Sequence, residues 1–213
     1  MKSIVILISG RGSNLKAILE ADLPVRIAAV ISNRPDAEGL TLAKQHGIQT
    51  EILDHRIFSG RETFDTDLAG LIDGYHPDLI VLAGFMRILT DAFVMHYQGR
   101  MINIHPSLLP AFPGLNTHLQ ALKEGVKIHG CTVHFVTPTL DHGPIIAQAA
   151  VHVLPADTPA TLSSRVLEQE HKIFPQAIRW FAEGRLHLGD NGIVNLSDPF
   201  MSHSALLSPW ESR

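Results

Sequence analysis

The sequence predicts an α/β protein with a doubly wound, mostly parallel sheet. We expect this sheet to be Rossmann-like in the N-terminal half and extended by antiparallel strands in the C-terminal half. In the first hundred residues, short apolar runs alternate four times with helical segments, the pattern of a parallel sheet covered by helices. The first apolar run enters a helix through a glycine-rich turn at residues 10–14. Two later apolar runs follow one another without a helix between them, which favours antiparallel pairing.

The apolar runs and the turn signals define the expected elements. Strands are expected at 4–8, 25–31, 48–53, 79–82, 101–105, 130–137 and 145–153. Helices are expected at 14–21, 37–46, 59–75 and 91–97, and a further helix begins after Thr158. Ser13 is the expected N-cap of the first helix, and Ser59 opens a capping box for the third. Pro159 fits the first position of the last helix, which Pro175 is expected to bend or break.

Composition excludes several classes of function. The formal net charge of −4 argues against a surface for nucleic acid or anionic membranes, because both need clustered Lys and Arg. No apolar run approaches the roughly 18 residues of a transmembrane helix. The single cysteine, Cys131, excludes an internal disulfide and is expected to be a small buried hydrophobe. The thirteen histidines lack HxxxH or HxH spacing with a helical Glu, so no metal site is expected. We expect a soluble, cytoplasmic protein.

The turn at 10–14 has the composition of a phosphate-binding loop. A dinucleotide-binding fingerprint would need a third Gly or Ala at position 15, which is Leu15, and an acid after the second strand, where the chain has Ser-Asn-Arg at 32–34. A Walker-type Gly-Lys-Ser/Thr is absent. The loop therefore suits a monophosphate bound by backbone N–H groups at a helix N-terminus. The alternative is a tight turn that binds no ligand.

A second cluster, NIHPSLLP, follows the fifth expected strand. Asn103 and His105 are two residues apart, so their side chains project to the same face of that strand. An amide can donate a hydrogen bond to a developing oxyanion, and an imidazole can transfer a proton, which together suit acyl chemistry. Asp141, in the loop before the last expected strand, could orient or charge that imidazole. The alternative is that these residues are structural.

Five stretches of the chain resemble a known family. ISGRGSNL, VLAGFMRIL, NIHPSLLPAFPG, HGCTVHFV and LDHGPIIAQ look like the phosphoribosylglycinamide formyltransferases, the folate-dependent enzymes of purine biosynthesis. The resemblance covers roughly residues 2 to 188. It implies that the formyl group of 10-formyltetrahydrofolate passes by direct attack to the amine of 5′-phosphoribosylglycinamide. The products would be N-formylglycinamide ribonucleotide and tetrahydrofolate.

The resemblance also implies roles for individual residues. The catalytic residues would be Asn103 and His105, which stabilise the oxyanion, and Asp141, which favours the imidazolium. The residues implied for the ribonucleotide are Gly12, Ser13, Asn14 and Glu170. The residues implied for the folate are Arg61, Met86, Arg87, Ile88, Leu89, Asn103, Leu140, Asp141 and Gly143. The chain has Leu167 where a bacterial form of the family has glutamine, which affects polar contacts near the ribose.

We expect one formyltransferase domain over residues 1–189, with a mononucleotide-binding half at 1–100 and a catalytic and folate half at 101–189. Residues 190–213 read as a loosely ordered tail. The expected partners are small molecules, without nucleic acid or membrane, for a monomer or homodimer. Rival interpretations are a formyltetrahydrofolate deformylase, with an extra N-terminal domain, and a methionyl-tRNA formyltransferase, with an added basic C-terminal domain. A phosphosugar-binding module and a nicotinamide-dependent dehydrogenase explain fewer of the residues.

Overall fold

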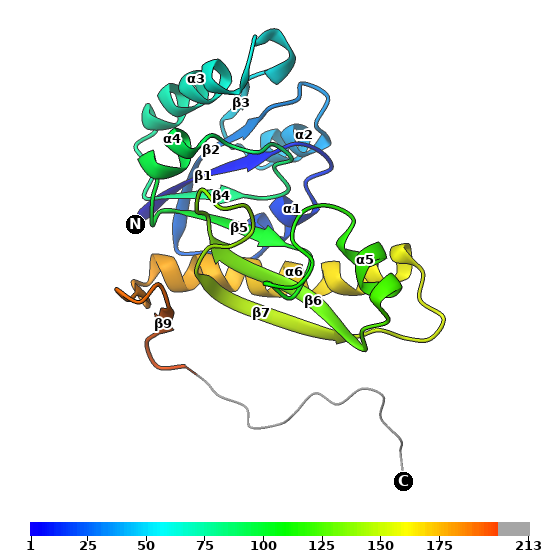
Figure 1. The fold of residues 1–213 in the computed structure, drawn as a ribbon. Helices are drawn as coiled ribbons and strands as arrows, with labels where there is room; N and C mark the ends of the chain where they lie inside the picture. Colours follow the sequence, from blue (N-terminus) through cyan, green and yellow to red (C-terminus); the bar gives the residue numbers. More distant parts are fainter. Residues whose placement is uncertain (200–213) are drawn as a thin grey trace.

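The computed structural model describes residues 1–199 and confirms the expected fold class. A seven-stranded sheet has the order β3-β2-β1-β4-β5-β6-β7 (Figure 1). Strands β1 to β5 pair in parallel, whereas β6 pairs antiparallel with β5 on one side and with β7 on the other. The strands of this sheet are β1 Lys2–Ile8, β2 Val25–Ser32, β3 Thr50–Ile52, β4 Leu79–Leu82, β5 Met101–His105, β6 Ile128–Phe135 and β7 Ile145–His152. The α-helices are α1 Ser13–Glu20, α2 Glu38–Gln45, α3 Arg61–Asp73, α4 Asp91–His96, α5 Thr117–Glu124 and α6 Pro159–Ala182. A 3-10 turn spans His55–Ile57, and a small hairpin consists of β8 Leu186–Leu188 and β9 Val194–Leu196.

Two hydrophobic cores cover the two faces of the sheet. Successive residues of β1 point to opposite faces: Ile4, Ile6 and Ile8 enter one core, and Val5 and Leu7 enter the other. The first core contains apolar side chains of α1, α2, α5 and α6, and the second contains those of α3 and α4. Figure 1 shows α6 crossing behind β6 and β7, away from α3 and α4. Burial on both faces explains why β1 is apolar at every one of these positions.

Two of the three expected helix N-caps differ in the structure. Gly12, not Ser13, caps α1, because the chain enters this helix through a left-handed turn at φ 80°. Gly60 caps α3 without a side-chain hydrogen bond, so the expected capping box at Ser59 is wrong. The extended backbone of Gly60 delays the start of the helix by one residue. The expected N-cap at Thr158 is confirmed, and the structure adds a capping box, since its hydroxyl accepts from the backbone N–H of Thr161 and the reciprocal bond is present.

The later elements depart from the expectation in three places. Helix α6 continues through Pro175, because the missing N–H removes one backbone bond while the surrounding residues stay buried against the sheet. Helix α5, after the proline-rich loop, was not expected. The tail prediction is wrong for 194–196, which form β9, and Arg185 donates to the carbonyl of Ser197 beside this hairpin. The rest of that expected tail, 200–213, lies outside the described residues. Within residues 1–199, no helix is long and apolar enough to cross a membrane.

Candidate active site

Most of the expected site residues lie at the carboxyl ends of β1, β4 and β5. Strand β1 lies between β2 and β4, so the chain order reverses at the β1–β4 boundary. Open α/β sheets bind ligands in the crevice at such a switch point. The loop at 10–14 follows β1, the stretch 86–89 follows β4, and Asn103 and His105 stand on the last three residues of β5.

Asn103 is oriented by a neighbour on the adjacent strand. The antiparallel register sets Asn103 opposite His134, and the amide nitrogen of Asn103 lies 3.3 Å from Nε2 of His134. Nδ1 of His134 lies 2.9 Å from the carbonyl oxygen of Phe135 and donates to it, which leaves Nε2 as an acceptor. Burial lowers the pKa of His134, although Asp141 acts in the opposite direction. A neutral His134 therefore accepts one N–H of the Asn103 amide. The second N–H of that amide remains for another acceptor.

Both ring nitrogens of the buried His105 face oxygen atoms. Nε2 lies 3.0 Å from the carbonyl oxygen of Phe112, and Nδ1 lies 3.5 Å from Oδ2 of Asp141. Each ring nitrogen therefore has a protein oxygen within reach, which fixes the orientation of the imidazole. The expected juxtaposition of His105 and Asp141 is therefore present.

Asp141 is fixed in a strained position. Its backbone is left-handed at φ 51°, a conformation that costs a non-glycine residue about 1–2 kcal/mol. Oδ2 of Asp141 accepts a 2.8 Å hydrogen bond from the backbone N–H of Gly114, and Oδ1 lies 4.0 Å from His134. Two positions later, a Cβ on Gly143 would overlap the carbonyl oxygen of Phe135, so this glycine allows close approach to β6. These contacts hold the carboxylate between the two histidines.

The loop after β1 is joined to α6 by a buried hydrogen bond. The amide nitrogen of Asn14 donates to Oε2 of Glu170 at 2.7 Å. Burial raises the pKa of Glu170, and the bond from Asn14 acts against this rise. Oδ1 of Asn14 is buried and has no hydrogen-bond partner within residues 1–199. Asn14 and Glu170 thus form a polar pair beside the glycine turn that can accept a polar ligand.

The stretch after β4 presents its backbone and its apolar side chains. Met86 and Ile88 are 67% and 57% exposed, whereas Leu89 is buried. The guanidinium of Arg87 stacks on the ring of Phe64 in α3, with the Cζ atom 4.5 Å from the ring centroid. Because Arg87 is engaged in this cation–π contact, the stretch is suited to binding a ring through backbone groups and apolar contact.

Two further residues, Cys131 and Arg61, contribute no side-chain hydrogen bond or ion pair to this polar cluster as the structure describes it. Burial raises the pKa of the Cys131 thiol to about 12, so it stays protonated, as expected of a small buried hydrophobe. Arg61 begins α3 and is exposed, and its side chain makes no hydrogen bond or ion pair within the part of the chain that the structure describes. The structure does not bring Arg61 into contact with the remaining candidates.

A family model described as formyl transferase matches residues 2–178. The chain belongs to the formyl transferase family. It is 53% identical over 193 residues to the phosphoribosylglycinamide formyltransferase of Escherichia coli K12, with 89% of this chain and 91% of that protein covered. A crystal structure of glycinamide ribonucleotide transformylase 1 from Symbiobacterium toebii superposes with a TM-score of 0.89 and 49% identity, covering 93% of this chain and 95% of that one.

A second solved structure supports the same assignment. The phosphoribosylglycinamide formyltransferase from Coxiella burnetii, in complex with CHES, gives a TM-score of 0.87 and 54% identity. The matched regions cover 92% of this chain and 93% of that one. The resemblance seen in the sequence motifs is therefore confirmed for this formyl transferase.

Two features of the formyl transferase site needed the structure. The contact of Asn103 with His134 depends on the register of two strands, for which the only sequence signal is the alternation of residues 132, 134 and 136. The acceptor at Phe112 and the donor at Gly114 are backbone groups at the end of the NIHPSLLPAFPG stretch, and the side chains of that stretch do not reveal which backbone groups face His105 and Asp141. Among residues 1–199 there is no group of three or more His, Cys, Asp or Glu placed to hold a metal ion.

Proposed function

We propose that this formyl transferase moves the formyl group of 10-formyltetrahydrofolate to the amine of 5′-phosphoribosylglycinamide. The products are N-formylglycinamide ribonucleotide and tetrahydrofolate. The observation that carries the proposal is the convergence of Asn103, His105 and Asp141 at the switch point of the sheet. The activity named for the E. coli relative, at 53% identity, supports the choice of substrates.

The reaction needs no covalent enzyme intermediate. The amine nitrogen forms a bond to the formyl carbon, and the carbonyl electrons move onto oxygen to give a tetrahedral oxyanion. The free N–H of Asn103 donates to this oxyanion, and His105, on the same face of β5, assists its stabilisation. The bond from the formyl carbon to N10 of the folate then breaks, and a proton passes from the attacking ammonium to N10 through His105 or a water molecule. Asp141 orients the imidazole of His105 through the contact at Nδ1.

The ribonucleotide binds at the start of α1. The backbone N–H groups of Gly12, Ser13 and Asn14 hold its 5′-phosphate, since a helix N-terminus carries about half a positive charge and unpaired donors. Glu170 accepts from the sugar or glycinamide portion, and Oδ1 of Asn14 takes a donor from the same molecule. Leu167 offers no polar group on its side of the ribose.

The folate lies against the second half of the site. The stretch Met86, Arg87, Ile88 and Leu89 cradles the pterin, largely through backbone groups, and Asn103 lies beside the reacting formyl group. The loop of Leu140, Asp141 and Gly143 closes over the pterin, with the half-exposed Leu140 providing an apolar contact. Arg61, which has no partner of its own within residues 1–199, pairs with a carboxylate of the folate tail.

Residues 1–189 form the formyltransferase domain in this proposal, with the ribonucleotide held mainly by 1–100 and the folate and chemistry mainly by 101–189. The protein acts on small molecules in the cytoplasm, as a monomer or homodimer, without nucleic acid, membrane or metal.

The decisive test mixes purified protein with 10-formyltetrahydrofolate or a 10-formyl-dideazafolate and follows loss of the formyl group by absorbance. Deformylation that requires the ribonucleotide is the expected result. Equal loss without the ribonucleotide would identify a hydrolase instead. No loss under either condition would favour a phosphosugar-binding module.

A further inference from the structure

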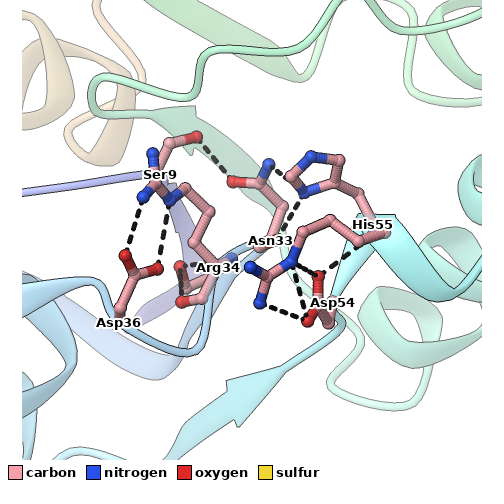
Figure 2. Close-up of polar contacts among 8 residues, drawn as sticks. Ser9, Asn33, Arg34, Asp36, Asp54 and His55 are labelled. Carbon is pink, nitrogen blue, oxygen red and sulfur yellow. Dashed lines mark hydrogen bonds and ion pairs between the residues drawn. The ribbon is translucent and has the colours of Figure 1, made fainter.

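A buried polar chain joins the carboxyl ends of β1, β2 and β3 (Figure 2). The hydroxyl of Ser9 donates a 2.6 Å hydrogen bond to Oδ1 of Asn33. The amide nitrogen of Asn33 lies 3.1 Å from Nδ1 of His55, and the same ring nitrogen lies 2.8 Å from the backbone oxygen of Asn33. The surface ion pair of Arg34 with Asp36 flanks this chain without entering it.

The other contact of Ser9 reaches the stretch that follows β4. The backbone N–H of Met86 donates to Oγ of Ser9 at 2.8 Å, across 77 positions of sequence and across the switch point of the sheet. At the far end of the same stretch, Oδ2 of Asp65 accepts from the backbone N–H of Thr90 at 2.6 Å. One buried side chain therefore holds each end of residues 86–90.

Ser9 and Asn33 have no evident role in building the core. They are 6% and 3% exposed, directly after the buried Ile8 and Ser32 that end β1 and β2. Burying polar groups is unfavourable unless each donor and acceptor is used, and here the Ser9 hydroxyl uses its donor on Asn33 and accepts from Met86. Asn33 also occupies the place where a dinucleotide-binding fold carries an acid for its ligand.

We propose that Ser9 and Asn33 are positioning residues for the folate. Asn33 aims the hydroxyl of Ser9, and Ser9 fixes the backbone of Met86 in the conformation that receives the pterin. This role rests on the proposed function, since it assigns the residues 86–90 to folate. Without the Ser9 hydroxyl the stretch must be ordered by the folate itself, which weakens folate binding and leaves the chemical step unchanged.

The test compares Ser9→Ala with Ser3→Ala, a matched control at the opposite end of β1 whose hydroxyl accepts from Arg26 instead. For each variant, KM for both substrates and kcat are measured in the formyl-transfer assay. Calorimetry measures Kd for 10-formyl-5,8-dideazafolate in the absence of turnover. We expect Ser9→Ala to raise the folate KM and Kd by about 2- to 10-fold, the factor for one neutral hydrogen bond. Its ribonucleotide KM and kcat, and every parameter of Ser3→Ala, should stay within about twofold.

A second variant tests the link between the two residues. Asn33→Ala leaves the Ser9 hydroxyl in place but removes its acceptor, and it should raise the folate KM in the same direction. If the two residues act as one unit, the double variant resembles the stronger single variant and the effects do not multiply. Asn33→Ala also provides the comparison if Ser9→Ala fails to fold.

Three results would overturn the positioning role while leaving the proposed function intact. These are an unchanged folate KM and Kd in both variants, an equal rise in the KM for both substrates, and the same folate effect in Ser3→Ala. If the unaltered protein neither binds the dideazafolate nor transfers its formyl group, the proposed function itself is wrong and the positioning role falls with it.

Discussion

Replacing Asn103 with alanine removes the donor assigned to the oxyanion and leaves the rest of the cluster in place. The amide nitrogen has two N–H groups, of which one faces Nε2 of His134 at 3.3 Å and the other is free for the substrate. Loss of one oxyanion donor usually lowers kcat by about 10²- to 10³-fold, equivalent to about 2.7–4 kcal/mol of transition-state stabilisation. His105 and Asp141 remain to transfer the proton, so activity should fall without disappearing.

The same substitution should change folding little. Asn103 is half-buried, and its bond to His134 is long, so its loss costs about 1 kcal/mol or less of unfolding free energy. We would measure kcat and KM by the absorbance assay, and unfolding by urea with circular dichroism. Asn195→Ala, in the exposed strand β9, is the matched control. A kcat within tenfold of the unaltered protein, with the fold intact, would refute the assignment of Asn103 as the oxyanion donor.

Three further predictions concern stability. Burial raises the pKa of Glu170, so its ionised form destabilises the fold at neutral pH. At pH 7.5 the Glu170→Gln variant should therefore unfold at a higher urea concentration than the unaltered protein. This difference should shrink toward pH 5, as Glu170 in the unaltered protein takes up its proton. A constant advantage across that range would contradict this. Two hydrogen bonds from Arg165 lower the pKa of Asp157, so Asp157→Ala should cost about 1.5–3 kcal/mol at pH 7. This difference should diminish below about pH 4, where the unfolded chain takes up a proton at Asp157 while the folded carboxylate is still ionised. An equal cost at pH 3 and pH 7 by urea unfolding would argue against the ion pair. At Gly47 (φ 69°) an added Cβ meets open space, so Gly47→Ala should lower the free energy of unfolding by about 1–2 kcal/mol. Gly12→Ala places a Cβ 2.8 Å from the α2 backbone, so it should lower this free energy further and weaken ribonucleotide binding. Equal losses for the two variants in thermal unfolding would show that the close approach at Gly12 is unimportant.

The sequence is sufficient to predict features that depend on periodicity alone. Strand β1 is apolar at successive positions because both faces are covered, and β4 and β5 have the bounds that their apolar runs predict. Asn103 and His105 share a face because strand side chains alternate, whatever the strand pairs with. These inferences need no knowledge of distant segments.

Features that depend on turns and on register could not be predicted in the same way. The left-handed backbone of Gly12 makes this glycine the N-cap and starts the helix at Ser13, one residue earlier than expected, and a serine followed by a helical pattern does not reveal this. Strand β9 is three residues long, too short for an alternating pattern to distinguish it from coil. The bonds of Ser9 to Asn33 and Met86 join segments 24 and 77 positions apart, and only the packed sheet determines that they meet.

The hydrogen bond from Asn14 to Glu170 has a consequence for synthesis on the ribosome. It joins residues 156 positions apart, so the glycine turn emerges among the first residues and its carboxylate partner among the last of the described fold. A nascent chain of 150 residues already contains Asn103, His105 and Asp141, yet it lacks all of α6. A chain that ends before α6 therefore lacks the carboxylate partner of Asn14, so the polar pair to which the proposed function assigns the ribonucleotide is completed only late in translation.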